Sequence, residues 1–110
     1  MIEKIILNYL LNNNINAYME VPTRPDDDMV IIEKTSSDFD NHIKRATFAI
    51  QSYGRTLLDA AELNETVKGI MLDIVALNEI GSCKLNSDYN YTDTTTKKYR
   101  YQAVFDVVYY

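Results

Sequence analysis

The sequence predicts an α+β fold, in which two helices pack on a mainly antiparallel sheet of about five strands. Two segments repeat apolar residues at helical spacing, and the segments between and after them alternate apolar and polar residues with a period of two. The chain has 110 residues, of which 46% are apolar and 25% are charged. This length and composition are typical of one globular domain with one core, so we expect residues 1–110 to form a single domain.

The first two predicted elements are a helix over residues 2–11 and a strand over residues 15–21. The apolar face of the helix consists of Ile2, Ile5, Ile6, Tyr9 and Leu10. Asn12–Asn14 ends this helix, because asparagine competes for backbone hydrogen bonds and tolerates left-handed conformations. The apolar residues of the strand are Ile15, Ala17, Met19 and Val21. Pro22 and Pro25 end the strand.

A loop and two further strands are predicted next. Thr23–Asp28 is a loop with three consecutive carboxylates, and Met29–Lys34 is a short strand. Thr35–Asn41 is predicted to be a polar connection. Residues 42–53 form the third strand, and Gly54 breaks its alternation. The apolar face of this strand consists of Ala46, Phe48 and Ile50.

The longest predicted helix begins at Thr56 and ends near Asn78. Thr56 is its N-cap and Asp59 follows three positions later, which is the spacing of a capping box. Its apolar stripe consists of Ala60, Leu63, Val67, Ile70, Met71, Ile74 and Leu77. Its opposite face carries Glu62, Glu65, Lys68 and Asp73. Gly69 inside the helix predicts close packing there, because glycine costs about 1 kcal/mol relative to alanine in a helix.

Two strands complete the predicted fold. Ser82–Tyr91 is polar and alternates weakly, and Thr92–Lys97 is a turn or loop. Lys98–Tyr110 alternates clearly. One of its faces consists of Tyr99, Tyr101, Ala103, Phe105, Val107 and Tyr109. The predicted order of elements is therefore α-β-β-β-α-β-β.

Composition excludes several classes of function. One histidine, His42, and one cysteine, Cys83, exclude a histidine-pair metal site, a cysteine-rich zinc site and an internal disulfide. Three glycines in no motif exclude a phosphate-binding loop, and no nucleophile with a recognisable motif accompanies His42 and Asp40. The net charge of −5 argues against the clustered basic surface of a nucleic-acid-binding protein. We therefore expect no catalysis, no metal and no cofactor.

The sequence also predicts a cytoplasmic site of synthesis and folding. No apolar run approaches the ~20 residues of a membrane span. Glu3 and Lys4 interrupt the apolar N-terminus, which lacks the features of a secretory signal. The lone cysteine fits a reducing compartment.

Two polar segments are candidate contact surfaces. The run Asp26–Asp28 lacks the ligand spacing of a calcium-binding loop, so an exposed acidic loop that contacts a partner is favoured over a cation site. The second segment is a hairpin flanked by Tyr89, Tyr91, Tyr99 and Tyr101, with cations nearby. This composition favours a sheet or protein interface over stacking of single-stranded nucleic acid. The predicted partner-contact residues are Asp26, Asp27, Asp28, Tyr89, Tyr91, Lys97, Lys98 and Arg100.

Four stretches in order give the sequence a family resemblance. They read EVPTRP (Glu20–Pro25), MVIIEKT (Met29–Thr35), FAIQSYGRTLLDAAELNETV (Phe48–Val67) and KKYRYQAVFDVVY (Lys97–Tyr109). With the N-terminal helix, they resemble the small tail terminator, or tail completion, proteins of long-tailed bacteriophages and Gram-positive prophages. The resemblance covers nearly the whole chain, and it consists of loose patterns rather than catalytic signatures.

The resemblance implies a structural, non-enzymatic role in the virion. Members of this family form a hexameric ring that binds the last ring of the tail tube, stops its polymerisation and presents a surface to the head connector. The implied partners are other copies of the chain, the major tail tube protein and a head connector or head-closure protein. The implied location is the head-proximal end of the tail, after assembly in the host cytoplasm, with DNA passing through the ring without specific binding.

Two alternatives stay open on the sequence. A neighbouring neck component, either a head–tail connector or a head-closure protein, has a similar size and composition. A small nucleic-acid-binding or enzymatic domain is the other, and the net charge and the missing nucleophile count against it. No contact residue carries over individually from the family.

Overall fold

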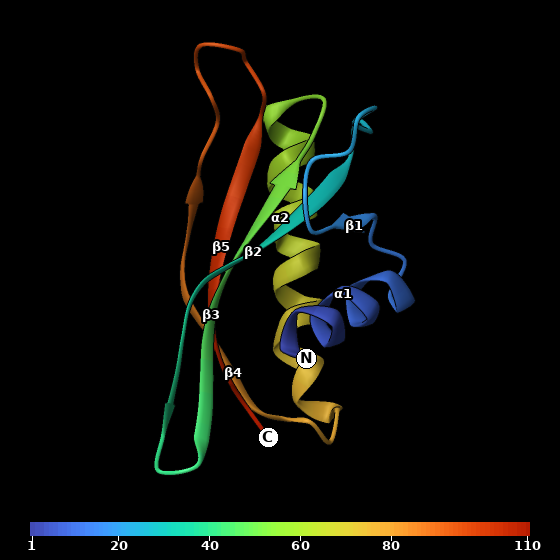
Figure 1. The fold of residues 1–110 in the computed structure, drawn as a ribbon. Helices are drawn as coiled ribbons and strands as arrows, with labels where there is room; N and C mark the ends of the chain where they lie inside the picture. Colours follow the sequence, from blue (N-terminus) through green and yellow to red (C-terminus); the bar gives the residue numbers. More distant parts are fainter.

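One five-stranded sheet carries two helices on the same face in the computed structural model, which describes residues 1–110 (Figure 1). The elements in order are α1 (Ile2–Asn12), β1 (Ala17–Tyr18), β2 (Met29–Asp40), β3 (Ile43–Tyr53), α2 (Leu57–Leu72), the 3-10 helix η1 (Asp73–Ala76), β4 (Ile80–Asn90) and β5 (Arg100–Tyr109). The α+β class and the order α-β-β-β-α-β-β are thus confirmed.

The strands lie in the order β1-β2-β3-β5-β4, and every neighbouring pair is antiparallel except β1 with β2. The hairpins β2–β3 and β4–β5 turn at opposite ends of the molecule, at the bottom and the top of Figure 1. The molecule measures 44 × 25 × 25 Å, with its long axis along the strands. The two hairpin ends therefore lie at opposite ends of the long axis.

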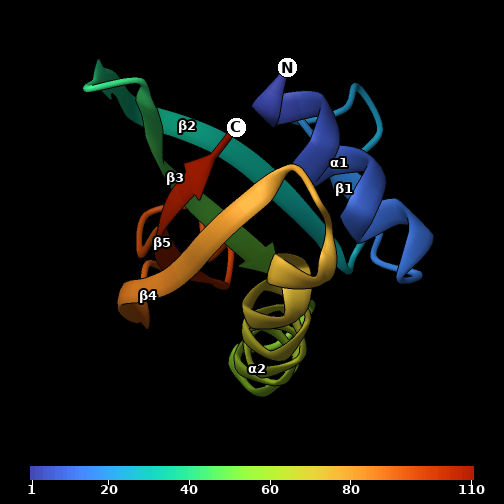
Figure 2. The same ribbon diagram turned by 90° about the horizontal axis from the view of Figure 1, so that it is seen from below.

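The core lies between the helices and one face of the sheet. Phe48 of β3 and Phe105 of β5 are cross-strand partners at its centre, and both are fully buried. α1 packs against the β1–β2 side, whereas α2 packs against β3, β4 and β5 (Figure 2). The helical residues in the core are Ile2, Ile6, Leu10, Ala60, Val67 and Met71. The predicted apolar faces of both helices and of β3 and β5 are confirmed.

The predicted strand over residues 15–21 is shorter in the structure. β1 pairs with β2 only at Ala17 and Tyr18, and the chain then leaves the sheet. Ile15 and Ala17 are buried as predicted, but Met19 and Val21 are exposed. Alternation alone was misleading here, because these last residues have no neighbouring strand to pair with.

The predicted polar connection 35–41 is wrong, because β2 continues through it to Asp40. A bulge between Lys34 and Ser36 shifts the register, and the ladder with β3 then runs on to the pair Asp40–Ile43. The hairpin turns at Asn41 and His42, whose φ angles are 49° and 65°. Positive φ at both central residues is typical of a type I′ turn, which matches the twist of paired strands.

The N-terminus of α2 agrees with the prediction, and its C-terminus does not. The Thr56 hydroxyl accepts a hydrogen bond from the Asp59 amide at 3.1 Å, as an N-cap does. At the other end, the Asp73 amide bonds to the carbonyl of Ile70, which also accepts the Tyr9 hydroxyl at 2.7 Å. The helix narrows here to a 3-10 turn, so the α-helix ends at Leu72 and the chain continues as η1 to Ala76.

Two details of the predicted helix faces are corrected. A side chain at Gly69 would touch nothing, so no close packing explains this glycine. Lys68 does not lie on a free outer face. Its ammonium reaches Asp88 of β4 at 3.2 Å and Glu65 at 2.6 Å, and its side chain is only 17% exposed. Sequence reasoning also missed the buried Asn64, which donates to the same Asp88 carboxylate at 3.2 Å.

Candidate interaction surface

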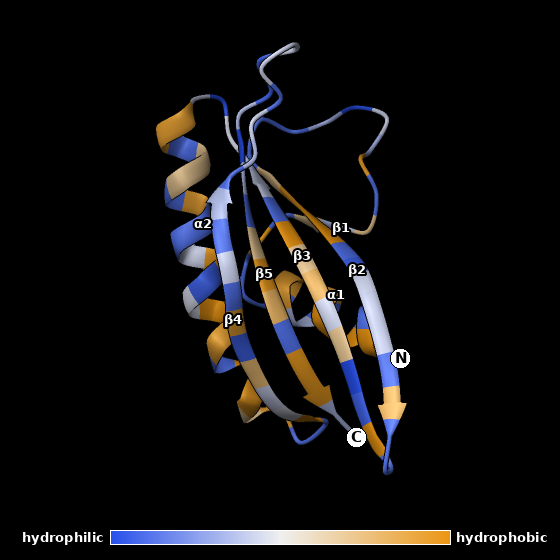
Figure 3. Cartoon of the chain, turned by 90° about the vertical axis from the view of Figure 1, so that its left-hand side faces the viewer, coloured by the Kyte–Doolittle hydropathy of each residue, from blue (hydrophilic) through white to orange (hydrophobic).

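The face of the sheet opposite the helices has no covering layer, and we call it the bare face (Figure 3). The strand registers place polar residues opposite one another across β3 and β5 on this face. These cross-strand pairs are Thr47–Asp106, Gln51–Gln102 and Tyr53–Arg100. Because these polar side chains contact one another across the strands, they order the bare face without a second layer.

Arg100 is held at the centre of one cluster on the bare face. Its guanidinium donates to the Tyr53 hydroxyl at 2.8 Å and to the Tyr91 carbonyl at 2.7 Å. It also lies over both rings, 5.6 Å from the centroid of Tyr53 and 4.6 Å from that of Tyr91. Tyr89 meets Tyr91 edge to face at 5.9 Å. The structure thus brings together three of the predicted contact residues, Tyr89, Tyr91 and Arg100.

A chain of side-chain hydrogen bonds links this cluster to β3. The Gln51 amide donates to Gln102 at 2.9 Å, and the Gln102 amide donates to the Tyr89 hydroxyl at 2.6 Å. Gln102 is only 8% exposed although no helix covers it. Gln51, Gln102 and Tyr53 were not predicted as surface-shaping residues. Their alternation places them on the outer side, but their partners depend on the register between distant strands.

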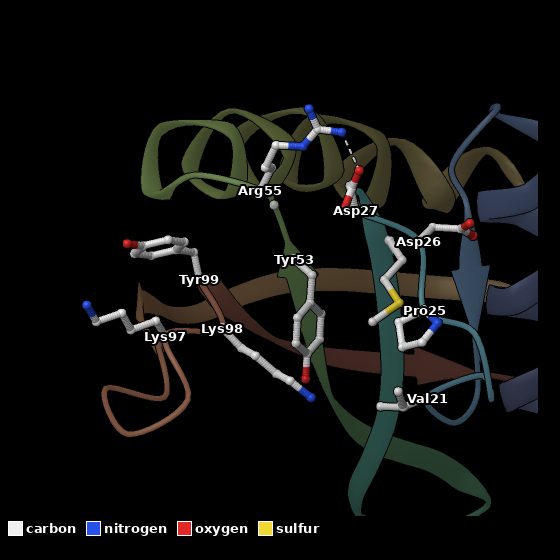
Figure 4. A pocket seen from close by; sticks show the side chains of 11 residues that line it. Val21, Pro25, Asp26, Asp27, Tyr53, Arg55, Lys97, Lys98 and Tyr99 are labelled. Carbon is white, nitrogen blue, oxygen red and sulfur yellow. Dashed lines mark hydrogen bonds and ion pairs between the residues drawn. The ribbon is translucent and has the colours of Figure 1, made fainter.

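A cleft of about 380 Å³ lies at the end of the molecule where the β4–β5 hairpin turns (Figure 4). Its lining includes Tyr53 and Met29 from the strands, Val21 and Pro25 from the loop before β2, and Lys98 and Tyr99 from the opposite hairpin. Gly54 lets the end of β3 pass close to the first turn of α2, because a side chain at this position would collide with the backbone nitrogen of Ala60. Three loops that are distant in sequence therefore form one hollow.

The predicted acidic loop is exposed, as expected, but its carboxylates are not three free charges. Asp26 accepts hydrogen bonds from Asn16 at 2.6 Å and from the Tyr18 hydroxyl at 2.8 Å, and these bonds hold the pKa of Asp26 below its ordinary value. Asp27 pairs with Arg55 at the rim of the cleft. The Asp28 carbonyl accepts from Asn16 at 3.2 Å. The loop is therefore tied to β1 and to the start of α2.

The predicted cations Lys97 and Lys98 lie on the hairpin wall of the cleft. Asp93 shapes their loop by accepting from the amides of Thr95 and Thr96, which lowers the pKa of Asp93. Lys98 points into the cleft beside Tyr53, whereas Lys97 points away from it (Figure 4). Neither ammonium group forms an ion pair within the chain. These two charges are available to a partner.

The residue types that most often hold metal ions do not cluster in the structure. No three His, Cys, Asp or Glu side chains come close enough to hold a metal ion. Burial raises the pKa of the Cys83 thiol to about 11, so this side chain stays protonated. His42 lies in the turn of the β2–β3 hairpin, with its ring against the edge of Phe39. No helix is long and apolar enough to cross a membrane.

The sequence matches no protein-family model and no curated protein. The fold and the surfaces define the chain as an α+β domain whose sheet presents an uncovered, preordered polar and aromatic face. A cleft with free cations lies at one end of that sheet.

Proposed function

We propose that the protein is a structural component of a bacteriophage virion. In this proposal it is a tail terminator subunit that caps the tail tube as a ring, stops tail polymerisation and provides the surface for joining to the head. The sequence resemblance runs from the first helix to the last strand, and the observed order of elements is the one that the sequence predicts. The observation that carries the proposal is the bare face, with Arg100 fixed between Tyr53 and Tyr91.

Preordered tyrosine and arginine side chains are typical of protein interfaces. These residue types are enriched in the central parts of interfaces and among the residues that dominate binding energy. Tyr89 and Tyr91 are partly exposed, and their contacts with each other and with Arg100 already limit their motion. A surface whose side chains are ordered before binding loses little entropy when a partner arrives.

The free edges of the sheet also support assembly. β4 has an unpaired outer edge, and β2 pairs with β1 only at Val30 and Ile31, so the rest of its outer edge is free. A closed ring needs two different patches on each subunit, because its interfaces are heterologous. Each edge offers unpaired backbone groups to another copy or to a different partner.

The direct test is binding to purified tail tubes. Tubes are incubated with the protein and imaged by electron microscopy, and we expect density at one tube end and no further tube growth. Arg100→Ala and Tyr91→Ala should reduce end binding about tenfold or more, as loss of a central interface residue does. Glu62→Ala, on the exposed side of α2, is the matched control and should bind normally.

Disruption of the gene in the phage or prophage that encodes it separates this role from that of a neck component. Loss of a terminator should leave filled heads beside overlong tails, whereas loss of a head-closure protein should leave heads that leak DNA. Tails of normal length in the disrupted phage would contradict the terminator proposal.

A further inference from the structure

We propose that the β2–β3 hairpin tip of one copy docks into the cleft of a second copy. The hairpin tip is defined here as residues 38–43, and the cleft is the hollow around Tyr53 and Met29 described above. This contact deepens the proposed ring by naming one of its subunit interfaces, and to that extent it rests on the proposed function.

The hairpin tip is apolar and acidic. Phe39 is 64% exposed, which is unusual for a phenylalanine, and Ile43, on the opposite face of the hairpin, is also exposed. Asp38 and Asp40 precede and follow Phe39 in β2, so their carboxylates project from the face opposite its ring, and residues 38–43 contain no lysine or arginine. The nearest cation on the phenylalanine side, Lys44, lies over the Tyr109 ring at 5.9 Å. Arg45, two residues beyond the tip, is the cross-strand partner of Asp38.

The cleft complements this tip in shape and charge. Its lining includes the apolar and aromatic residues Val21, Pro25 and Tyr99, together with Met29 and Tyr53, which are only 4% and 9% exposed. The rim acids are already engaged, because Asp26 accepts from Asn16 and Tyr18 and Asp27 pairs with Arg55. Lys97 and Lys98 have no such partners, so the charge left free at this end is positive. A tip that carries an exposed aromatic ring and two carboxylates outside any ion pair matches this combination.

The tip cannot reach the cleft of its own chain. β2 begins at the cleft with Met29 and ends at the tip with Asp40, so the two features lie at opposite ends of a molecule 44 Å long. The contact is therefore between copies and joins two different patches. Such a contact leaves one free tip and one free cleft on every dimer, and it propagates to a closed ring or an open filament.

A second hollow is a weaker candidate for the tip. It lies between α1 and β1, and its apolar lining includes Leu7, Leu11 and Met19. Glu20 also lines it, and that carboxylate would oppose Asp38 and Asp40. Charge therefore selects the cleft over this groove.

Disulfide trapping tests the contact directly. In a Cys83→Ala background, Asp40→Cys and Lys98→Cys are combined, and the protein is mildly oxidised at high concentration. We expect a ladder of linked oligomers, because every copy carries both halves of the contact. The single-cysteine variants can give dimers at most. A yield from the pair no higher than from the single variants, or a ladder from Asp40→Cys with Glu20→Cys instead, overturns the assignment.

Charge reversal gives an independent test. Asp38→Lys with Asp40→Lys, and separately Lys97→Glu with Lys98→Glu, should each weaken self-association about tenfold or more. An equimolar mixture of the two variants should associate again, since each tip then finds a cleft of opposite charge. Sedimentation velocity measures all three samples, and circular dichroism checks folding. Absence of recovery in the mixture contradicts the contact.

The outcomes separate this inference from the proposed function. A ladder and a recovered mixture without any tube capping would support the contact and contradict the terminator role. Tube capping by the charge-reversed variants at normal levels would support the terminator role and contradict the contact.

Discussion

The face of the sheet that packs on the helices is apolar, whereas the bare face consists mainly of polar and aromatic side chains, apart from the buried Met29 and Ile31 at one end of β2. Phe48 and Phe105 are buried among helical side chains on the first face, and three residues away along the same strands Gln51 and Gln102 hydrogen-bond on the second. Burial of apolar surface is non-directional and strong, while side-chain hydrogen bonds are directional and individually weak. The first face therefore stabilises the fold, and the second maintains a defined surface.

The largest difference between the faces should appear on truncation of a central aromatic residue. Phe48→Ala removes a fully buried ring and should lower the free energy of unfolding by about 3–5 kcal/mol. Val104→Ala on the half-exposed bare face should cost about 1 kcal/mol or less. Denaturant unfolding measures both variants. Similar losses of unfolding free energy in the two variants would mean that the bare face stabilises the fold as a core does, which contradicts the assigned difference between the two faces.

On the covered side, charge is used at the Lys34–Glu3 pair between β2 and α1 and at Lys68. Lys68 lies between α2 and β4, and Lys68→Asp would set a carboxylate beside Asp88 and remove both ion pairs. We expect a loss of about 2 kcal/mol, the range for a hydrogen bond to a charged group. Lys68→Met keeps the aliphatic stem and should cost about half as much. Equal stability of Lys68→Asp and the parent in denaturant unfolding would restore the outer-face interpretation of the sequence.

Arg100 should matter less for folding than Lys68 and more for binding. Arg100→Ala removes two hydrogen bonds and two ring contacts at a partly exposed site, so we expect a loss of about 1 kcal/mol. Arg100→Lys should recover less than half of it, because lysine cannot donate in the same fork. Thermal unfolding of the two variants measures this. Full recovery by lysine would show that charge alone matters there.

The covered face was predictable from the sequence because burial on one side imposes a period of two, as in Ala46, Phe48 and Ile50. The β2–β3 hairpin tip was missed for the converse reason. Residues 35–40 contact no core on either face, so pairing with β3 gives them strand structure without any pattern. Lys68 was misplaced because a helical wheel does not reveal which strand passes beside the helix.

The sequence predicted individual residues of the candidate surfaces but not the contacts between them. Tyr89, Tyr91 and Arg100 were identified by residue type, but their contact with Tyr53 follows from the register of β3 against β5. The cleft requires three loops to meet at one end of the sheet, and no local pattern encodes that meeting. Local alternation determines which face a side chain occupies, while register and loop paths determine its neighbours.

The smallest predicted effect lies at the edge of the bare face, where Asp26 bonds to Asn16 and Tyr18. Because these bonds lower the pKa of Asp26 in the folded state, its contribution to stability is complete above the ordinary value of 3.8 and is lost as the pH falls through the lower folded value. Asp26→Asn keeps an acceptor oxygen but removes the charge. The melting temperature of the variant should therefore be slightly below that of the parent at pH 6, and the two melting temperatures should converge at about pH 2. Asp28→Asn is the matched control, since that carboxylate accepts no hydrogen bond within the chain. Its melting temperature should follow the parent more closely at every pH, and a larger shift for Asp28→Asn than for Asp26→Asn would contradict the assigned bonds.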